Sequence, residues 1–533
     1  MSTAFKSQTQ VIIVGGGPVG LGLAIDLGQR DVRCVLIERF KTPQPIPKGQ
    51  NLTQRTLEHL YFWGVEQELR AARTIPREYG IGGMTAYGTL LSDYKYDWLQ
   101  RELVRPYYFT DNERLPQYAT EVVLRDRISE LPSVETVYGW SAEAIEQAAD
   151  GVTVAIAERD GYQRRTLRAD YVVGCDGSRS LVRQATGISQ TLSDHDRLMV
   201  LLVFRSTGLH KLLERFPNKS FYNVLHPDLK GYWKFFGRVD LGTTWFFHAP
   251  VPLGTTKDNF DFRGYLHAAV GKEFDVEFEH IGFWDLRVAI ADQYRKGRAF
   301  IAGDAAHSHP PYGGYGINTG LEDAANLGWK LAACLQGWAG AGLLDSYGEE
   351  RQPVFASTAR DFIEKAIRAD KEFLAKFDPA IDREAFEAEW KVRSTGARSE
   401  VNSFEPNYGG SSIVAGAPSG ISSAIGSHEF VARAGHHLAP RQLATGRNIF
   451  EELGGGFTLL DLGGAEKAVA DIARAAKADD VPLKVIRDDR AESRAFYKAT
   501  CILIRPDQFV AWTSNGNVHD PVEIIRRAIG GHP

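Results

Sequence analysis

Cysteine is scarce in this chain, which has only four among its 533 residues. The four lie far apart in the sequence, and none belongs to a C-x-x-C pair. Disulfide frameworks and structural zinc sites need closely patterned cysteines, so neither is expected, and no bound metal is predicted. The same usage is typical of a reducing compartment and predicts a cytoplasmic protein. The cysteines are Cys34, Cys175, Cys334 and Cys501.

Long apolar runs and an excess of either charge are also missing. No stretch approaches the run of about 18 apolar residues that makes a transmembrane helix, and no secretory-signal pattern opens the chain. The net charge is −5, from 62 basic and 67 acidic side chains. Neither nucleic acid nor a membrane is therefore expected as a partner. The length suggests about three domains of roughly 150 residues each.

The first positive feature is a glycine-rich turn near the N-terminus. The apolar run 11–14 leads directly into a G-x-G-x-x-G motif, a helical pattern follows, and a second apolar run, 34–37, ends at Glu38. In a dinucleotide-binding βαβ unit the first glycine makes the turn, the second admits the pyrophosphate, and the third lets the helix pack on the strand. Glu38 lies where an acidic side chain accepts hydrogen bonds from ribose hydroxyls. The residues expected to bind the dinucleotide here are Gly15, Gly17, Pro18, Val19, Gly20, Glu38 and Arg39.

Two further apolar runs are each followed by an aspartate. Residues 299–302 (AFIA) have the length of a buried strand and stop at Gly303 and Asp304, after which comes a loop rich in proline and glycine. A helix is expected from about Gly320, and its positive N-terminal end is suited to an anionic group. Another apolar run ends near Asp176. Each aspartate alone could belong to an ordinary turn or cap a helix, but together with the glycine-rich turn they favour a cofactor site.

These three segments, in this order, resemble the class A flavoprotein aromatic hydroxylases, which are single-component FAD monooxygenases. Further matches are RTLE at residues 55–58, PQYATE at 116–121 and LLDSY at 343–347. The chain looks most similar to the phenol hydroxylase and pentachlorophenol monooxygenase branch, over residues up to about 400. The Gly-Asp stretch is the most specific part of this resemblance.

The resemblance implies a fold of three parts. An α/β FAD-binding Rossmann-like domain of the GR2 type would carry an inserted antiparallel β-sheet as the substrate domain. The stretches assigned to that sheet are rich in aromatic residues and short alternating runs, as strands are. A thioredoxin-like domain would close the chain, and without C-x-x-C it cannot perform disulfide chemistry. The expected boundaries are 1–80, 113–194 and 284–400 for the FAD domain, 81–112 and 195–283 for the substrate domain, and 401–533 for the C-terminal domain.

The implied activity is hydroxylation of a phenolic or other aromatic substrate by FAD, NAD(P)H and O2, through a flavin C4a-hydroperoxide. The partners would be a small aromatic substrate and O2, and a homodimer is expected. The choice between NADPH and NADH stays open. An alternative is an FAD-dependent dehydrogenase or reductase of the same fold that inserts no oxygen. A flavin-dependent halogenase is disfavoured because its Trp-x-Trp-x-Ile-Pro motif is absent.

Two departures from the family pattern bear on the substrate. Where many relatives read PPTGGQGMN, residues 310–318 read PPYGGYGIN, which puts two tyrosines beside the flavin loop. The acidic residue that phenol hydroxylase places near the substrate hydroxyl falls in register on Gln50, so no acidic base can be assigned. Tyr315 is therefore predicted to position the substrate through its hydroxyl, with deprotonation completed through either His309 or a water chain and with Pro311 packing by the flavin ring.

The remaining candidates are assigned by register with the family or by their place in the aromatic strands. Each could instead be an ordinary packing or loop residue. The predicted catalytic residues are Tyr315, His309 and Pro311. The cofactor residues predicted beyond the glycine-rich turn are Arg55 (near the FAD phosphates), Gln117, Asp176, Gly303, Asp304, Pro311, Gly314, Gly316, Ile317 and Asn318. The substrate candidates are Tyr222, Tyr312, Tyr315, His248 and Arg287.

Overall fold

A computed structural model describes residues 7–79, 82–416, 420–463, 466–516, 518 and 520–531, without the side chains of residues 194–196, 397 and 399. The domain boundary predicted between residues 80 and 81 lies outside the described residues. The first unit, called here the FAD-type unit because the predicted FAD residues lie in it, has a six-stranded sheet in which five neighbouring strands are parallel and one edge strand is antiparallel. In spatial order its strands are β17 (Arg295–Lys296), β18 (Ala299–Ile301), β11 (Tyr171–Gly174), β1 (Val11–Val14), β2 (Cys34–Glu38) and β7 (Val134–Tyr138).

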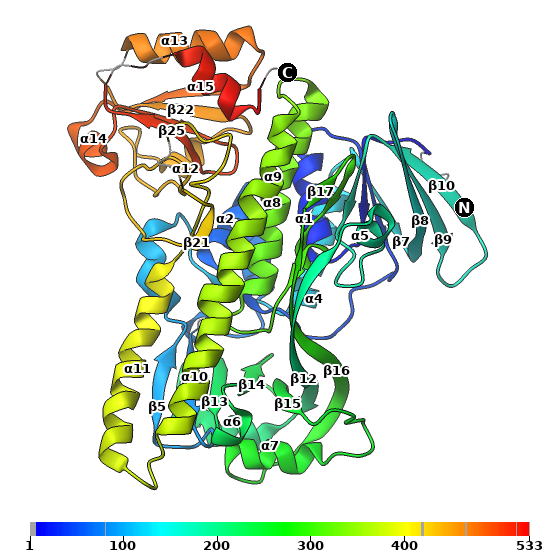
Figure 1. The fold of residues 1–533 in the computed structure, drawn as a ribbon, viewed down its shortest axis with the longest axis vertical. Coiled ribbons are helices and arrows are strands. Elements are labelled where there is room, and N and C mark those ends of the chain that lie inside the picture. The colour runs from blue at the N-terminus through cyan, green and yellow to red at the C-terminus, as the bar shows by residue number, and fades with distance from the viewer. Residues whose placement is uncertain are drawn as a thin grey trace.

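Long helices pack on this sheet because its central strands are apolar along their whole length. Helix α1 (Pro18–Gly28) packs against α8 (Tyr315–Gln336), and α8 packs against α9 (Gly342–Ser357). Helices α8 and α9 run side by side through the centre of the molecule (Figure 1). Helix α8 begins five residues before the expected Gly320, because Gly313 and Gly314 both adopt left-handed φ angles that end the preceding loop. The remaining helices of this unit are α2 (Gln54–Phe62), α3 (Glu66–Ala71), α4 (Gln117–Ser129) and α5 (Leu181–Thr186).

The second unit is an eight-stranded sheet, which is antiparallel except for one parallel pair, β4 and β13. Its two longest strands pass through the predicted boundaries at 194/195 and 283/284, so the units share continuous strands rather than meeting at loops. In spatial order the strands are β19 (His307–Ser308), β16 (Glu277–Ala291), β12 (Gln190–Arg205), β15 (Thr244–Val251), β14 (Trp233–Arg238), β13 (Phe221–Leu225), β4 (Gly83–Tyr87) and β5 (Lys95–Trp98).

The two faces of the eight-stranded sheet have different neighbours. Short helices α6 (Thr207–Leu212) and α7 (Phe262–Val270) bury one face in an apolar cluster. The opposite face, called here the cavity face because the substrate is expected to bind there, packs against α10 (Lys365–Lys376), α11 (Arg383–Ser403) and the loop that precedes α8. A π-helical segment, Thr358–Glu364, joins α9 to α10. The cavity face therefore points toward the FAD-type unit and its companion helices (Figure 1).

The C-terminal unit has a four-stranded sheet in the order β23-β22-β24-β25, with β22 and β23 parallel and the other pairs antiparallel. Helix α11 runs through the predicted boundary at 400/401. The strands of this unit are β22 (Phe457–Asp461), β23 (Leu483–Arg487), β24 (Cys501–Ile504) and β25 (Val510–Ser514), and its helices are α12 (Ile449–Glu452), α13 (Glu466–Ala478), α14 (Ala491–Tyr497) and α15 (Pro521–Ala528). Smaller pieces elsewhere are the sheet of β8 (Trp140–Ala148), β9 (Gly151–Glu158) and β10 (Arg164–Ala169), the pair β3 (Asn51–Leu52) and β6 (Glu113–Arg114), and the pair β20 (Phe404–Asn407) and β21 (Ser423–Ile425).

Among the described residues, the helices are either too short or too polar to span a bilayer.

Candidate active site

The turn from β1 to α1 has the geometry of a dinucleotide cradle. Gly15 has a φ of 106°, and a Cβ there would lie 2.3 Å from the carbonyl oxygen of Cys175. A Cβ on Gly20 would lie 1.9 Å from the carbonyl oxygen of Gly15. A Cβ on Gly17, in contrast, would meet nothing within 4 Å. Packing therefore requires two of the three glycines, and the third leaves open space at the N-terminus of α1, where Pro18 opens the helix.

Glu38 is held at the end of β2 by backbone N–H groups. Its Oε2 accepts from the N–H of Gly16 at 2.7 Å and its Oε1 accepts from the N–H of Phe40 at 2.8 Å. Each carboxylate oxygen keeps acceptor capacity for a sugar hydroxyl. Arg39 is exposed beside it, with its guanidinium 5.0 Å from the ring centre of Phe40.

Asp176 and Asp304 follow the C-terminal ends of neighbouring strands, β11 and β18. Asp176 Oδ2 accepts from the N–H of Leu181 at 2.7 Å, whereas its Oδ1 has no partner among the described residues. Asp304 is exposed although its neighbours Gly303 and Ala305 are buried, so its carboxylate is accessible to a ligand. Burial raises the pKa of the Asp176 carboxyl. The two carboxylates can thus accept hydrogen bonds from a hydroxyl-rich ligand.

The N-terminus of α8 faces the same region and is fixed by one side chain. Asn318 donates to the carbonyl oxygens of Asn51 and Gly314, and it accepts from the N–H of Thr53 and the hydroxyl of Thr56. No acidic residue lies in the first turn of α8 and no side chain caps it. Its backbone N–H groups are therefore left to stabilise a negatively charged ligand. Two other predicted residues lie in this turn: Gly316 close to His309, and Ile317 packed against Gly49.

Arg55 has a different role from the one predicted. All of its guanidinium nitrogens are engaged by protein groups: the carboxylates of Glu322 and Glu58, the side chain of Gln508 and the carbonyl oxygen of Asp507. An arginine has five N–H donors, so none is left for a phosphate. The prediction that Arg55 contacts the FAD phosphates is therefore corrected: the residue joins α2 and α8 to the C-terminal unit.

Gln117, at the start of α4, lies between two elements of the FAD-type unit. Its Oε1 accepts from the N–H of Gly49 at 3.5 Å, and its Nε2 donates to Glu121 at 2.9 Å. This position ties α4 to the loop before β3. A cofactor contact by Gln117 stays a prediction.

The register of the eight-stranded sheet brings polar groups together on the cavity face. Asn223, Phe235, His248 and Leu201 are direct neighbours on β13, β14, β15 and β12, so they form one row across the sheet. Asn223 Oδ1 and His248 Nδ1 have no partner among the described residues. Burial lowers the pKa of His248 to about 4, so its imidazole is neutral at neutral pH. This row supplies uncharged polar atoms inside an otherwise aromatic wall.

Tyr312 lies over the cavity face, and its role in substrate binding stays a prediction. Its ring packs against Trp98 and Trp233, with centroids 5.5 Å and 5.1 Å away. Burial raises the pKa of Tyr312 well above its ordinary value, so the phenol stays protonated.

Tyr222 lies on the other face of the sheet and is removed as a substrate candidate. It is in register with Met84, Phe236 and, one strand further, Phe247, all within the cluster beneath α6 and α7. Its hydroxyl donates to the carbonyl oxygen of Lys219. Side chains alternate between faces along a strand, so a shift of one position separates Tyr222 from the row of Asn223.

Tyr315 points toward α11 and is not free to bind substrate as predicted. Its hydroxyl donates to Glu400 at 3.0 Å, and its ring packs on Phe404 with centroids 4.5 Å apart. Burial raises the pKa of Glu400, and burial also raises that of Tyr315. The pair fixes the loop before α8 against α11, so Tyr315 shapes the cavity wall through packing.

His309 keeps one nitrogen available. Its Nδ1 donates to the carbonyl oxygen of Pro310, which leaves Nε2 as the acceptor, and this atom is buried without a partner among the described residues. Burial lowers the pKa of His309 to about 4, so the ring accepts a hydrogen bond better than it keeps a proton. Pro311 follows in the loop and is half-buried.

Arg287 lies away from the aromatic row, at the end of β16 that approaches the two Asp motifs. It interacts electrostatically with Arg183, whose guanidinium donates to the carbonyl oxygens of Ala305 and Ser178. Its position favours the cofactor end of the cavity over the aromatic face.

Arg114 and Gln50 are the site residues that the sequence reading did not identify as a pair. Arg114 donates through Nη2 to Gln50 Oε1 at 2.7 Å, and its guanidinium lies 4.5 Å from the ring centre of Phe221 on the cavity face. The two residues are 64 positions apart and meet only because β3 pairs with β6. The only hint in the sequence is that Arg114 lies just before the PQYATE motif.

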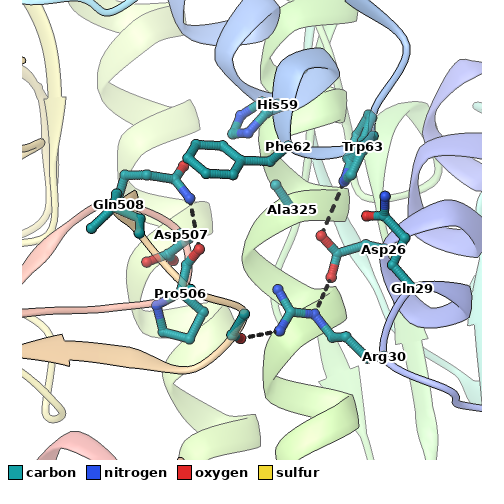
Figure 2. A pocket seen from close by; sticks show the side chains of 13 residues that line it. Asp26, Gln29, Arg30, His59, Phe62, Trp63, Ala325, Pro506, Asp507 and Gln508 are labelled. Carbon is teal, nitrogen blue, oxygen red and sulfur yellow. Dashed lines mark hydrogen bonds and ion pairs between the residues drawn. The ribbon is translucent and has the colours of Figure 1, made fainter. Parts of the chain in front are cut away.

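A separate crevice of about 180 Å³ lies at the seam between the FAD-type and C-terminal units (Figure 2). Asp26 accepts there from Arg30 at 2.9 Å and from the indole of Trp63 at 3.0 Å, while Arg30 also donates to the carbonyl oxygen of Gly455. Because these groups already satisfy one another, the crevice is a joint between units. Within the described part of the chain, no three His, Cys, Asp or Glu side chains gather as a metal site would require.

Comparison with known proteins identifies families and relatives that match most of this chain. The model of an FAD binding domain matches residues 8–361, and that of the aromatic-ring hydroxylase C-terminal region matches residues 432–533. The 4-methyl-5-nitrocatechol 5-monooxygenase of Burkholderia sp is 30% identical, over 98% of this chain and 97% of that protein. The rifampicin monooxygenase of Streptomyces venezuelae is 36% identical, over 64% of this chain and 68% of that protein.

Two solved structures share the architecture over nearly the full length of both chains. The rebeccamycin biosynthetic enzyme RebC with reduced flavin aligns with a TM-score of 0.84 at 28% identity, over 98% of this chain and 99% of that one. A ternary complex of aklavinone-11 hydroxylase with FAD and aklavinone aligns with a TM-score of 0.80 at 25% identity, over 99% and 100%.

Proposed function

The chain belongs to the family of FAD-dependent aromatic-ring hydroxylases and is a flavoprotein monooxygenase, and from this membership we propose that it hydroxylates a phenolic ring with NAD(P)H and O2. The proposal rests on the cavity face of the eight-stranded sheet. This aromatic wall includes the unpartnered Asn223 Oδ1 and His248 Nδ1, and it packs against the loop that leads to α8. The full-length similarity to a nitrocatechol monooxygenase supports a phenol as substrate.

The residues around the glycine-rich turn fit FAD. Glu38 would bind the ribose, Gly17 leaves room for the pyrophosphate, and Asp304 would hold the ribityl chain, with Asp176 beside it. The N-terminus of α8 would stabilise negative charge on the pyrimidine ring, and Pro311 would pack near the ring. When bound, FAD supplies the redox chemistry with NAD(P)H and O2, and the protein supplies position and electrostatics.

The chain's own residues would position the phenol and exclude water. Tyr312 and His248 lie on the cavity face, and the neutral His248 can exchange hydrogen bonds with a substrate oxygen without carrying charge. His309 Nε2, near Gly316, can accept a hydrogen bond from the reacting region. The surrounding aromatic residues would exclude water from the site. Reactive oxygen species formed there would then not be consumed by side reactions with water.

We assign the three predicted parts as domains, with strands β12 and β16 and helix α11 running across the predicted boundaries. The order β-α-β-α-β-β-α of the C-terminal unit and its strand order support a thioredoxin-like domain. Burial raises the pKa of its only cysteine, Cys501, to about 12, which supports a structural role without redox chemistry. The predicted homodimer would be tested by light scattering of the purified protein.

Isotope labelling tests the proposed activity. The FAD-loaded protein is supplied with NADPH or NADH and a panel of phenols under ¹⁸O₂, and products are read by mass spectrometry. The proposal expects substrate-stimulated NAD(P)H oxidation and one ¹⁸O atom in the ring product. Stimulated oxidation with unlabelled product from every phenol would instead favour an oxidoreductase that inserts no oxygen.

A further inference from the structure

Arg114 is a buried arginine whose charge is not balanced by any ion pair in the described residues. Only 4% of it is exposed, and its Nε and Nη1 have no hydrogen-bond partner there. Gln50, 3% exposed, accepts from Arg114 and presents its own unpartnered Nε2. The pair therefore forms a cluster of N–H donors without an acceptor.

The groups around Arg114 do not neutralise it. Arg238, which has the same charge, and Tyr222, a phenol, interact with Arg114 electrostatically from the opposite face of the sheet. The neighbouring Glu113 uses its carboxylate on Arg70 and Arg73. Burial, together with Arg238, lowers the pKa of Arg114 to about 9, yet it remains charged at neutral pH. A buried cation without a counter-ion is costly, and an anion that enters the site recovers that cost.

The donors lie between the two walls of the proposed substrate site. The Arg114 guanidinium covers Phe221, whose ring belongs to the cavity face. Asn51, beside Gln50 on β3 and paired with Arg114 in the sheet register, receives the hydrogen bond from Asn318 at the start of α8. An oxygen held by the donors would thus lie at the junction of the aromatic wall and the α8 loop.

We propose that Arg114 and Gln50 bind the substrate's phenolate oxygen, so that the enzyme selects phenols already ionised and uses no protein carboxylate as base. The phenol O–H bond breaks in solution, where water accepts the proton. The phenolate then binds without any change in covalent bonds. Acidic phenols, such as those with a ring nitro group, are then preferred over simple phenols. The inference rests on the proposed function for the identity of the ligand, and on the unpaired donors for its charge.

The test uses the FAD-loaded protein without reductant and 4-nitrophenol as the probe, because the absorbance of this phenol reports its ionisation. In the wild-type protein, bound 4-nitrophenol should show the phenolate spectrum at pH values where the free compound is mostly neutral. Arg114→Gln should weaken phenolate binding by about 30-fold or more, the low end of the loss when a buried charge pair is truncated. Arg114→Lys should recover part of the affinity.

Two controls separate charge recognition from general damage. Binding of 4-nitroanisole, which has no ionisable oxygen, should change less than two-fold between wild type and Arg114→Gln. Arg238→Lys, a charge-preserving change on the far face, should leave 4-nitrophenol affinity within two-fold. FAD absorbance and circular dichroism check the fold, and Gln50→Leu gives a second, milder route if Arg114→Gln does not fold.

The inference is overturned by any of four results. These are unchanged phenolate affinity in folded Arg114→Gln or Gln50→Leu, equal weakening of 4-nitroanisole, no binding of 4-nitrophenol by wild type, or preferential binding of 4-nitrobenzoate. Loss of FAD from a folded Arg114→Gln would also overturn it, by assigning the donors to the cofactor. Phenolate binding through Arg114 without ¹⁸O incorporation would contradict the proposed function and leave this inference standing.

Discussion

The seam between the FAD-type and C-terminal units and the cavity under the α8 loop both bury charged groups, but only the seam balances them. At the seam, Arg505 is 2% exposed and donates to both Glu350 and Asp507. Burial alone would raise the pKa of Glu350, but Arg505 and Lys330 hold it far below its usual range. In the cavity, Arg114 and Asp176 keep unpartnered polar atoms. The difference separates a structural joint, whose buried charges are paired within the protein, from a site whose buried donors and acceptors are left for a ligand.

The largest expected effect comes from breaking the seam. Arg505→Met should lower the free energy of unfolding by about 3–5 kcal/mol, because it leaves the buried carboxylates of Glu350 and Asp507 without their main cation. Urea unfolding followed by circular dichroism measures the loss. Arg474→Gln, which breaks the exposed pair with Asp471, is the control and should cost at most about 1 kcal/mol. If Arg505→Met lowered the free energy of unfolding by less than about 1 kcal/mol, the distinction between the two regions would not hold.

Changing a cavity carboxylate should affect the ligand more than the fold. Asp304→Ala should weaken FAD binding by about 1–3 kcal/mol, because the ribityl hydroxyls would lose their acceptor, while the apo protein keeps its stability. Quenching of flavin fluorescence during titration of the apo protein gives the affinity. Asp304→Asn retains an acceptor oxygen and should lose less. Equal FAD affinity in wild type and Asp304→Ala would count against the assigned role.

The buried histidines of the cavity should make stability depend on pH. His248 and His309 have folded pKa values of about 4, below the ordinary value of 6.5, so the unfolded chain binds more protons between these limits. The free energy of unfolding should therefore fall as the pH falls from about 6.5 to about 4, by on the order of 3 kcal/mol per histidine. Urea unfolding at several pH values should show a smaller decline for His248→Phe than for the wild type, by the contribution of one histidine. An identical pH profile in wild type and variant would refute the burial argument.

The smallest effect is expected at Tyr315. Tyr315→Phe should cost about 1 kcal/mol of stability through loss of the hydrogen bond to Glu400, and should change the KM for a phenol less than two-fold. Steady-state NAD(P)H oxidation and hydrogen peroxide release measure the outcome. Tyr312→Phe is the matched change on the cavity face. A large rise in KM and peroxide for Tyr315→Phe would restore the role predicted from sequence.

Local patterns carried most of what the sequence could predict. The strands and turns that carry the glycine-rich motif, Glu38 and the two aspartates form where the sequence predicts them, because each depends on a short local segment. Long-range packing decided the rest. The face of Tyr222 depends on strand register, Arg55 on the C-terminal unit, and Tyr315 on a helix 85 residues away. No local pattern in the sequence encodes those contacts.

Thermal unfolding with and without FAD compares the seam and the proposed cofactor site in one measurement. Arg505→Met should have a lower Tm in both forms and an unchanged gain in Tm from FAD. Asp304→Ala should have an unchanged apo Tm and a reduced gain, since stabilisation by a ligand follows its affinity. An FAD gain that disappears in Arg505→Met and persists in Asp304→Ala would contradict the assignment of the cavity as the cofactor site.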